Sequence, residues 1–194
     1  MNYKKNVLFI DHHLAHAAST FFLSPYKKAA ILTIDGVGEW TTTAYGIGEN
    51  NNITLLKEIK FPSSIGLLYS TITAYLGFSV NNSEYKVMGL SPYGNRNKET
   101  NPFYKKLKQV IDIKEDGSYR FDMSYFVFQH SSKMPSRKLC KLLGGSVRKP
   151  ESELVQKHKD IAAALQMITE DVIIKILNHL HEKIKCDNLV MAGG

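Results

Sequence analysis

Cysteine is scarce in this chain of 194 residues, which contains only two. Cys140 and Cys186 lie far apart and stand outside any Cys-x-x-Cys pair. This spacing excludes a disulfide-stapled scaffold and a structural zinc finger, because both need several closely spaced cysteines. We therefore expect both thiols to be reduced.

Long hydrophobic runs are also absent. No stretch approaches the roughly 18 apolar residues of a membrane-spanning helix, and the first six residues lead into the short apolar run 7–10 rather than into a signal peptide. We expect a cytoplasmic, soluble protein without a membrane partner. With 43% hydrophobic residues, the chain can bury one sizeable core or form a large part of a two-lobed protein.

Acidic residues are fewer than basic ones, and the formal net charge is +7. The excess lies in lysine-rich segments at 105–108, 137–141 and 148–149. Aromatic residues do not alternate regularly with these lysines, as they do in a platform for single-stranded nucleic acid. We interpret the segments as solvated helix faces and expect no nucleic-acid partner. Anionic small substrates are compatible with the charge but are not demonstrated by it.

The most informative motif that is present is a histidine pair, His12 and His16, directly after the apolar run 7–10. On a helix, residues four apart point the same way, so the two imidazoles can share one metal ion. A third candidate ligand, Asp35, ends the apolar run 30–34 and is followed by a glycine-rich turn. Two imidazoles and a carboxylate form a plausible site for a divalent transition metal.

Each of these residues also has a simpler interpretation. A histidine pair with this spacing also occurs on solvated helix faces, and an aspartate at the end of a strand is a common turn or capping residue. The order strand, histidine helix, strand, aspartate, glycine turn favours the metal site. His13 lacks this support and is expected to be structural or to support a metal ligand without binding the ion itself.

The hydrophobic pattern predicts a chain of alternating helices and strands. Strands are expected over residues 7–10, 29–35, 41–48, 53–61 and 187–192, and helices over 12–23 and 64–78. Residues 151–185 have helical periodicity and form one long helix or two. The segment 81–94 reads as irregular. An inserted subdomain is expected over about 101–150, with a helix at 102–112, a hairpin-like stretch at 119–128 and a helix at 136–143.

Five blocks together resemble the O-carbamoyltransferases, which include nodulation and antibiotic-tailoring enzymes. The blocks are Asp11-His-His-Leu-Ala-His-Ala-Ala-Ser19, Thr33-Ile-Asp-Gly-Val-Gly-Glu-Trp40, Ser64-Ile-Gly-Leu-Leu-Tyr-Ser70, Glu84-Tyr-Lys-Val-Met-Gly-Leu-Ser-Pro-Tyr-Gly94 and His158-Lys-Asp-Ile-Ala-Ala163. They cover nearly the whole chain in the order of the family, which makes the resemblance far more specific than any single motif.

The resemblance implies a mixed α/β fold of the ASKHA, actin-like ATPase type, with two lobes and a cleft between them. Residues 1–194 would form part of the family's N-terminal catalytic domain, similar to that of the universal tRNA threonylcarbamoylation protein, and the YrdC-like C-terminal domain of the family is not present in them. The implied reaction uses carbamoyl phosphate and ATP, passes through a carbamoyl-adenylate and carbamoylates a hydroxyl of a small-molecule or carbohydrate acceptor. The acceptor's identity and the oligomeric state are not implied.

The resemblance also implies roles for particular residues. His12, His16 and Asp35 match the metal ligands, with Fe(II) the ion most often associated. Gly36 and Gly38 match glycines that allow close approach of the backbone to phosphate or carbamoyl oxygens, and Gly193 and Gly194 match the start of a nucleotide loop. Lys86 matches a residue that makes a cationic contact to phosphate. Glu84 would orient Lys86 or contact the acceptor. Without the family resemblance, Glu84 and Lys86 are equally expected to form a surface ion pair.

Complete members of the family have a preceding phosphate loop, a further carboxylate ligand and the rest of the nucleotide loop. We therefore expect this chain to be an interior piece that is inactive alone. Two alternatives stay open: a carbamoyltransferase of the hydrogenase-maturation type, and a non-catalytic protein that binds metal or nucleotide. A tRNA-modifying relative is disfavoured, because it would carry different residues around its two histidines.

Overall fold

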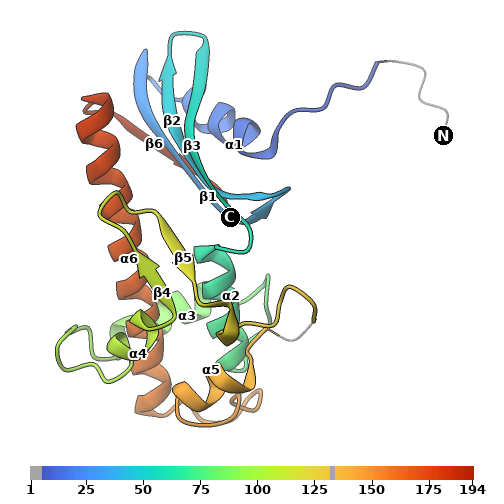
Figure 1. The fold of residues 1–194 in the computed structure, drawn as a ribbon, viewed down its shortest axis with the longest axis vertical. Helices are drawn as coiled ribbons and strands as arrows, with labels where there is room; N and C mark the ends of the chain where they lie inside the picture. Colours follow the sequence, from blue (N-terminus) through green and yellow to red (C-terminus); the bar gives the residue numbers. More distant parts are fainter. Residues whose placement is uncertain (1–5, 132–133) are drawn as a thin grey trace.

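A four-stranded mixed sheet forms the upper part of the computed structural model, which describes residues 6–131 and 134–194 (Figure 1). The strands are β1 (Lys28–Gly38), β2 (Thr41–Glu49), β3 (Asn52–Lys60) and β6 (Leu189–Ala192), in the order β3-β2-β1-β6. β1 pairs antiparallel with β2 and parallel with β6, and β2 pairs antiparallel with β3. The fold is therefore mixed α/β, as predicted.

The two faces of the sheet are covered by different helices. Helix α1 (His12–Phe21) covers one face and buries Ala17 and Phe21 against Ile31 and Val190 in a small apolar cluster. The opposite face contributes Leu32 to the main core, which it shares with the helices below the sheet. Because side chains alternate between the two faces of a strand, neighbouring residues of β1 pack into the two clusters in turn.

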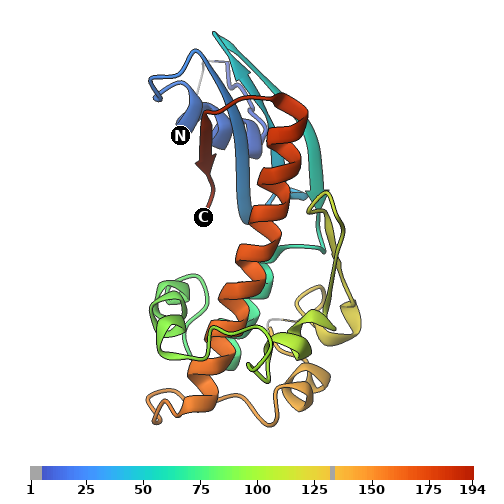
Figure 2. The same cartoon turned by 90° about the vertical axis from the view of Figure 1, so that its left-hand side faces the viewer.

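Helix α6 (Gln156–Ile184) connects the sheet to the lower part of the molecule (Figure 2). Its 29 residues make it about 43 Å long at 1.5 Å per residue. Apolar residues recur every three or four positions and are buried along its length, which explains why it packs as one continuous helix. These residues are Ile161, Leu165, Ile168, Val172, Ile176 and Leu180.

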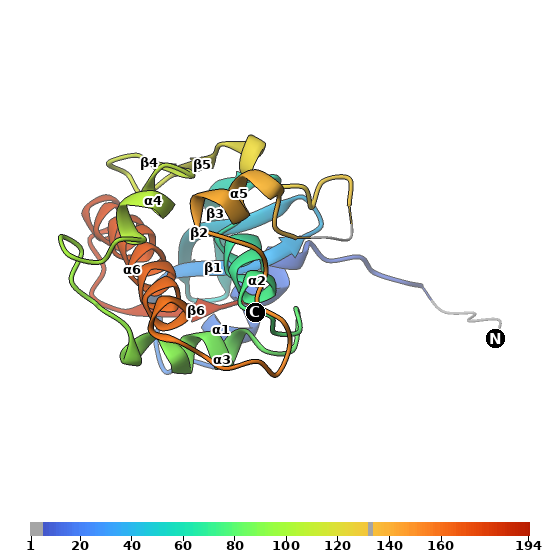
Figure 3. The ribbon, with the colours of Figure 1, turned by 90° about the horizontal axis from the view of Figure 1, so that it is seen from below.

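Short elements surround the lower half of α6. They are α2 (Ile65–Tyr75), α3 (Glu84–Leu90), the 3-10 turns η1 (Ser91–Tyr93) and η2 (Met123–Tyr125), α4 (Tyr104–Lys108), the hairpin of β4 (Ile111–Ile113) and β5 (Tyr119–Phe121), and α5 (Arg137–Leu142). Residues of 101–150 such as Leu107, Val110 and Leu139 share one hydrophobic core with α2 and α6. Seen from below, the β4–β5 hairpin and α1 lie on opposite sides of the molecule (Figure 3).

The structure differs from the sequence prediction at four places. The helix expected over 102–112 ends at Lys108 as α4, and the end of that range belongs to strand β4. Residues 7–10 form no strand, and the side chains of Leu8 and Phe9 are 86% and 95% exposed. The segment expected to be irregular contains α3 and η1, and the hairpin lies at 111–121 rather than at 119–128. The region 151–185, for which one helix or two were possible, contains α6 as a single helix.

None of the helices in the described part of the chain combines the length and apolar character that a membrane span requires.

Candidate metal centre and adjoining pocket

The two histidines of the candidate site lie on the first turns of α1. The Asp11 carboxylate caps this helix by accepting a hydrogen bond from the Leu14 N–H at 3.0 Å. Helix formation directly after Asp11 places His12 and His16 on one face, as their spacing predicts. Both side chains are partly exposed, at 39% and 29%, so a ligand can reach them.

His13 sets the rotation of α1 on the sheet. Its ring is completely buried, its Nε2–H donates to the Thr41 carbonyl at 2.9 Å, and its Nδ1 lies 2.7 Å from the Thr33 hydroxyl. These bonds join the helix to both β1 and β2. They hold His13 inside the fold and thereby turn its neighbour His12 toward the end of β1, in agreement with the structural role expected for His13.

Asp35 meets both histidines at the end of β1. Its Oδ2 lies 2.6 Å from His12 Nε2 and 3.1 Å from His16 Nε2, and the two Nε2 atoms are 3.0 Å apart. Burial alone would raise the pKa of Asp35, but hydrogen bonds from the His12 ring, the Gly36 N–H and the His16 ring outweigh it and lower the pKa. The carboxylate is therefore ionised at neutral pH.

The donor set of this cluster fits a divalent transition metal. Within the described residues, His12, His16 and Asp35 form a group of ligand atoms that lie within 4.8 Å of one another. Two ligands that bind one ion at about 2.1 Å and at right angles are about 3.0 Å apart. Two of the three separations agree with this value, and the shorter one, between His12 and Asp35, is that of a charge-assisted hydrogen bond.

Two glycines make the close packing around the cluster possible. A Cβ atom on Gly38 would stand 2.1 Å from His12 Cδ2, and one on Gly66 would stand 2.8 Å from the Asp35 carbonyl oxygen. Gly36 differs, because nothing lies within 4 Å of the position its Cβ would take. Gly38 thus leaves room for the imidazole itself, whereas the space beside Gly36 is open to a ligand.

A pocket of about 440 Å³ opens beside the cluster, between the end of β1 and helix α2. Asp35, Gly36, Gly194 and Glu84 line it, together with Ile34, Ile65, Gly66, Tyr69, Ser70, Asn81 and Thr169. This lining contains two carboxylates and no lysine or arginine. An anionic group entering the pocket therefore needs a cation to balance its charge, and the neighbouring cluster is suited to bind one.

The amino end of α2 is tied directly to Asp35 and Gly36. Ser64 caps the helix by accepting the Leu67 N–H at 3.0 Å, and its hydroxyl donates to the Gly36 carbonyl at 2.6 Å. The bond of Ser64 to Gly36 depends on how the helix meets the sheet. This contact fixes one wall of the pocket relative to the cluster.

Residues 1–194 match the sequence profile of a protein family described as the carbamoyltransferase N-terminus. The chain belongs to the carbamoyltransferase family. The match covers the full chain and confirms the resemblance that the sequence blocks indicated.

Relatives of this carbamoyltransferase chain include two nodulation proteins. Nodulation protein NolNO of Sinorhizobium fredii is 31% identical over 97% of the chain, and nodulation protein NolO of Bradyrhizobium diazoefficiens is 29% identical over 95%. An uncharacterized protein of Synechocystis sp. is 46% identical over 97% of the chain. The chain spans 30%, 25% and 31% of the lengths of the Synechocystis protein, NolNO and NolO, respectively.

Within this carbamoyltransferase domain, the two glycines at the end of β6 lie against β1. Gly193 has a positive φ of 113°, and a Cβ there would stand 1.8 Å from the Ile34 carbonyl oxygen. A Cβ on Gly194 would stand 3.4 Å from Asp35 Oδ1. The expected nucleotide-loop glycines are thus adjacent to the cluster and its pocket.

Glu84 and Lys86 have different surroundings in the carbamoyltransferase domain. The Glu84 carboxylate lines the pocket and accepts hydrogen bonds from the Ser70 hydroxyl at 2.8 Å and from the Asn81 and Ser83 N–H groups at 2.9 and 3.1 Å. Lys86 is exposed on α3, and it is not among the described residues that line the pocket. The ion pairs within the described part of the chain do not include Glu84 with Lys86.

Four residues of the pocket were not identified individually by any sequence motif. They are Tyr69, Ser70, Asn81 and Thr169. Burial raises the pKa of Tyr69 to about 12, with smaller contributions from nearby Glu170 and Glu84, so its phenol is neutral. The hydroxyl of Tyr69 donates to Gln166 Oε1 at 3.0 Å. The block of residues 64–70 contributed to the family resemblance without a role for its single side chains, and the packing of α2 against α6 shows which of them face the pocket.

Proposed function

We propose that the protein is an O-carbamoyltransferase that uses carbamoyl phosphate and ATP, through a carbamoyl-adenylate, to carbamoylate a hydroxyl of a small-molecule or carbohydrate acceptor. The observation that carries this proposal is the convergence of His12, His16 and Asp35 beside a pocket, in a chain of the carbamoyltransferase family. An ASKHA-type two-lobed architecture, of which this chain forms a part, belongs to the same proposal.

His12, His16 and Asp35 would hold a divalent ion, for which we propose Fe(II). When bound, such an ion supplies positive charge that neutralises phosphate or carbamoyl oxygens as negative charge develops on them. The protein itself would contribute the geometry: His13 fixes the rotation of α1, and Gly38 leaves room for the His12 imidazole. The neutral phenol of Tyr69 and the ionised carboxylate of Glu84 would orient the ligand inside the pocket.

The other proposed roles follow from the positions of the glycines and of α3. Gly36, Gly193 and Gly194 would let the backbone approach nucleotide or carbamoyl oxygens near Asp35, since Gly36 borders open space and Gly194 lines the pocket. A phosphate contact of Lys86 stays a proposal that rests on the family resemblance, because the side chain is exposed outside the pocket.

We further propose that the protein is cytoplasmic and that neither a nucleic acid nor a membrane is a partner. Many surface lysines are paired with nearby carboxylates rather than gathered into one basic stripe, which supports this proposal. Examples are Lys98 with Asp171, Lys114 with Asp112, Lys138 with Asp122 and Lys175 with Glu115.

The direct test is the ATP-dependent consumption of carbamoyl phosphate by the protein at its full natural length, purified without oxygen and loaded with Fe(II). We expect consumption by the wild type, and its loss in His12→Ala and in Asp35→Ala. His130→Ala is the matched control, because His130 is exposed and outside the cluster. A folded, metal-loaded wild type that consumes no carbamoyl phosphate would contradict the proposal and favour a protein that only binds metal or nucleotide.

A further inference from the structure

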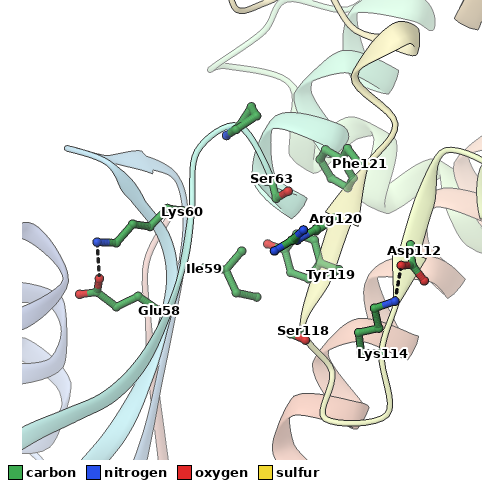
Figure 4. Close-up of a pocket in the computed structure, with 11 residues that line it drawn as sticks. Glu58, Ile59, Lys60, Ser63, Asp112, Lys114, Ser118, Tyr119, Arg120 and Phe121 are labelled. Atoms are coloured by element: carbon green, nitrogen blue, oxygen red, sulfur yellow. Dashed lines mark ion pairs between the residues drawn. The ribbon is translucent and has the colours of Figure 1, made fainter.

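The hairpin of β4 and β5 reaches the candidate site through a buried side chain, that of Tyr119. The residue is 2% exposed and belongs to the main hydrophobic core, where its ring centroid lies 5.7 Å from that of Phe121. Figure 4 shows the Tyr119 side chain extending from β5 toward the segment of Ile59 and Ser63, which leads into α2. The region 101–150, in which no site residue was expected, thus meets the amino end of α2.

The hydroxyl of Tyr119 is the hydrogen-bond partner of the first N–H group of α2. The Ile65 N–H donates to it at 3.0 Å. The first N–H groups of a helix have no partner inside the helix, and Ile65 is only 3% exposed, so its N–H depends on a partner from the protein. The Thr43 hydroxyl lies 3.1 Å from the same oxygen. One hydroxyl group therefore joins β5, α2 and β2.

The turn of α2 that Tyr119 contacts also touches the end of β1. The Ser64 hydroxyl donates to the Gly36 carbonyl at 2.6 Å, and a Cβ on Gly66 would stand 2.8 Å from the Asp35 carbonyl oxygen. The same turn lines the pocket beside the cluster. A shift of this helix end would therefore move the wall of the pocket and the backbone that carries the Asp35 carboxylate.

The hairpin that carries Tyr119 is anchored on both sides. Asp116 in its turn pairs with Lys57 of β3 at 3.3 Å, and Glu115 pairs with Lys175 of α6 at 3.4 Å. Such exposed pairs contribute little individually, but the buried side chains of the hairpin share one core with α2 and α6. The position of the Tyr119 hydroxyl is therefore set by the hairpin and its core contacts, and not by the cluster.

We propose that Tyr119 is a positioning residue of the candidate site: its hydroxyl holds the amino end of α2 against Asp35 and Gly36. It thereby links the β4–β5 hairpin to the metal centre and its pocket. Tyr119 is not among the described residues that line this pocket, so it acts through the first turn of α2. The effect on metal binding rests on the proposed function, whereas the link between the hairpin and α2 requires no metal.

The test compares Tyr119→Phe with Tyr75→Phe in the protein at its full natural length. Each substitution removes one hydroxyl from a buried side chain and keeps the ring. Tyr75 is the matched control, because it lies at the other end of α2 and its hydroxyl donates to the Leu143 carbonyl at 3.3 Å. Hydrogen–deuterium exchange of the metal-free protein, measured by mass spectrometry, reports on the two ends of α2 separately. Anaerobic calorimetric titration with Fe(II) reports on the metal centre, and thermal unfolding checks that each variant is folded.

In Tyr119→Phe we expect faster exchange at residues 63–68 and 34–38. We also expect Fe(II) binding to be weakened about three- to tenfold, somewhat less than when a direct partner of a metal ligand is removed. In Tyr75→Phe we expect faster exchange only at the carboxyl end of α2, with the Fe(II) affinity of the wild type.

A double variant tests whether Tyr119 acts through the first turn of α2. Ser64→Ala removes the bond from this turn to the Gly36 carbonyl. Tyr119→Phe should therefore weaken Fe(II) binding much less in a Ser64→Ala background than in the wild type, because the two substitutions disturb the same contact. Fully additive losses would overturn this route.

Unchanged exchange at residues 63–68 in Tyr119→Phe would overturn the link to α2, whether or not the protein binds Fe(II). Equal Fe(II) affinity of Tyr119→Phe and the wild type, or an equal loss in Tyr75→Phe, would show that Tyr119 does not position the site. A wild type that binds no Fe(II) would contradict the proposed metal centre instead. Exchange at residues 34–38 would then decide whether Tyr119 positions the end of β1.

Discussion

The Nε2 atom of His12 lies 2.6 Å from Oδ2 of Asp35, although 23 residues separate them in the chain. The contact exists because α1 packs on the sheet with His13 buried beneath it and because Asp35 stands at the end of β1. One helix and one strand thus bring the histidine pair and the carboxylate together. The contact depends on the fold and is part of the proposed metal centre.

Gly38→Ala should disturb the cluster while leaving the fold intact. The new Cβ would stand 2.1 Å from His12 Cδ2, so the imidazole has to move away from Asp35. We expect strongly weakened metal binding with a small change in the free energy of unfolding. Gly36→Ala is the matched control, because its Cβ meets nothing within 4 Å. Equal metal affinity of the two variants, measured by calorimetric titration, would show that Gly38 does not shape the site.

His13→Ala should destabilise the protein by about 2–4 kcal/mol, because it leaves a cavity and removes the donor to the buried Thr41 carbonyl. Urea unfolding measures this change. Thr33→Ser retains the hydroxyl beside the ring and should cost much less. A His13→Ala variant as stable as the wild type would mean that His13 does not hold α1 on the sheet.

Glu84 should make stability depend on pH in the acidic range. Burial raises its pKa, but hydrogen bonds from the Asn81 N–H, the Ser70 hydroxyl and the Ser83 N–H outweigh burial and lower the pKa below its ordinary value of 4.5. A lowered native pKa stabilises the fold at pH above about 4.5, and this contribution disappears as the pH falls through the native pKa.

The wild type should therefore be more stable than Glu84→Gln at pH 7, and the difference between them should shrink as the pH falls below about 4.5. Urea unfolding of both proteins across this range provides the measurement. A difference that stays constant with pH would show that the hydrogen bonds to Glu84 do not favour its ionised form.

Local sequence patterns were sufficient for most of the sheet and for the helix with the histidine pair. The apolar runs and turns predicted β1, β2, β3 and β6 to within a few residues, because the period of a strand is a local property. Residues 7–10 have equally strong β propensity, yet they form no strand. Strand formation also requires a neighbouring strand, and none pairs with these residues in the described part of the chain.

Short elements were harder to predict for a physical reason. Helix α3 has seven residues, fewer than the window over which helical periodicity becomes visible. The turn of the β4–β5 hairpin contains Asp116 followed by Gly117, whose φ is 79°. Asp-Gly is a strong hairpin signal, and it stands at the position of this turn.

The candidate site was predictable only in part. Spacing alone placed His12 and His16 on one face, and the position of Asp35 at a strand end made it available to them. The contact of Ser64 with Gly36 and that of Ser70 with Glu84 join elements that are distant in sequence. Such contacts depend on how α2 and α3 pack below the sheet, which no local pattern encodes.

The most direct measurement is the metal content of the protein at its full natural length after anaerobic loading with Fe(II) and removal of excess ion. If His12, His16 and Asp35 form the metal centre, the wild type and His130→Ala will each retain about one ion per chain, and His12→Ala and Asp35→Ala will retain almost none. Equal metal content in all four folded proteins, or none in the wild type, would contradict the assignment of this cluster as the metal centre.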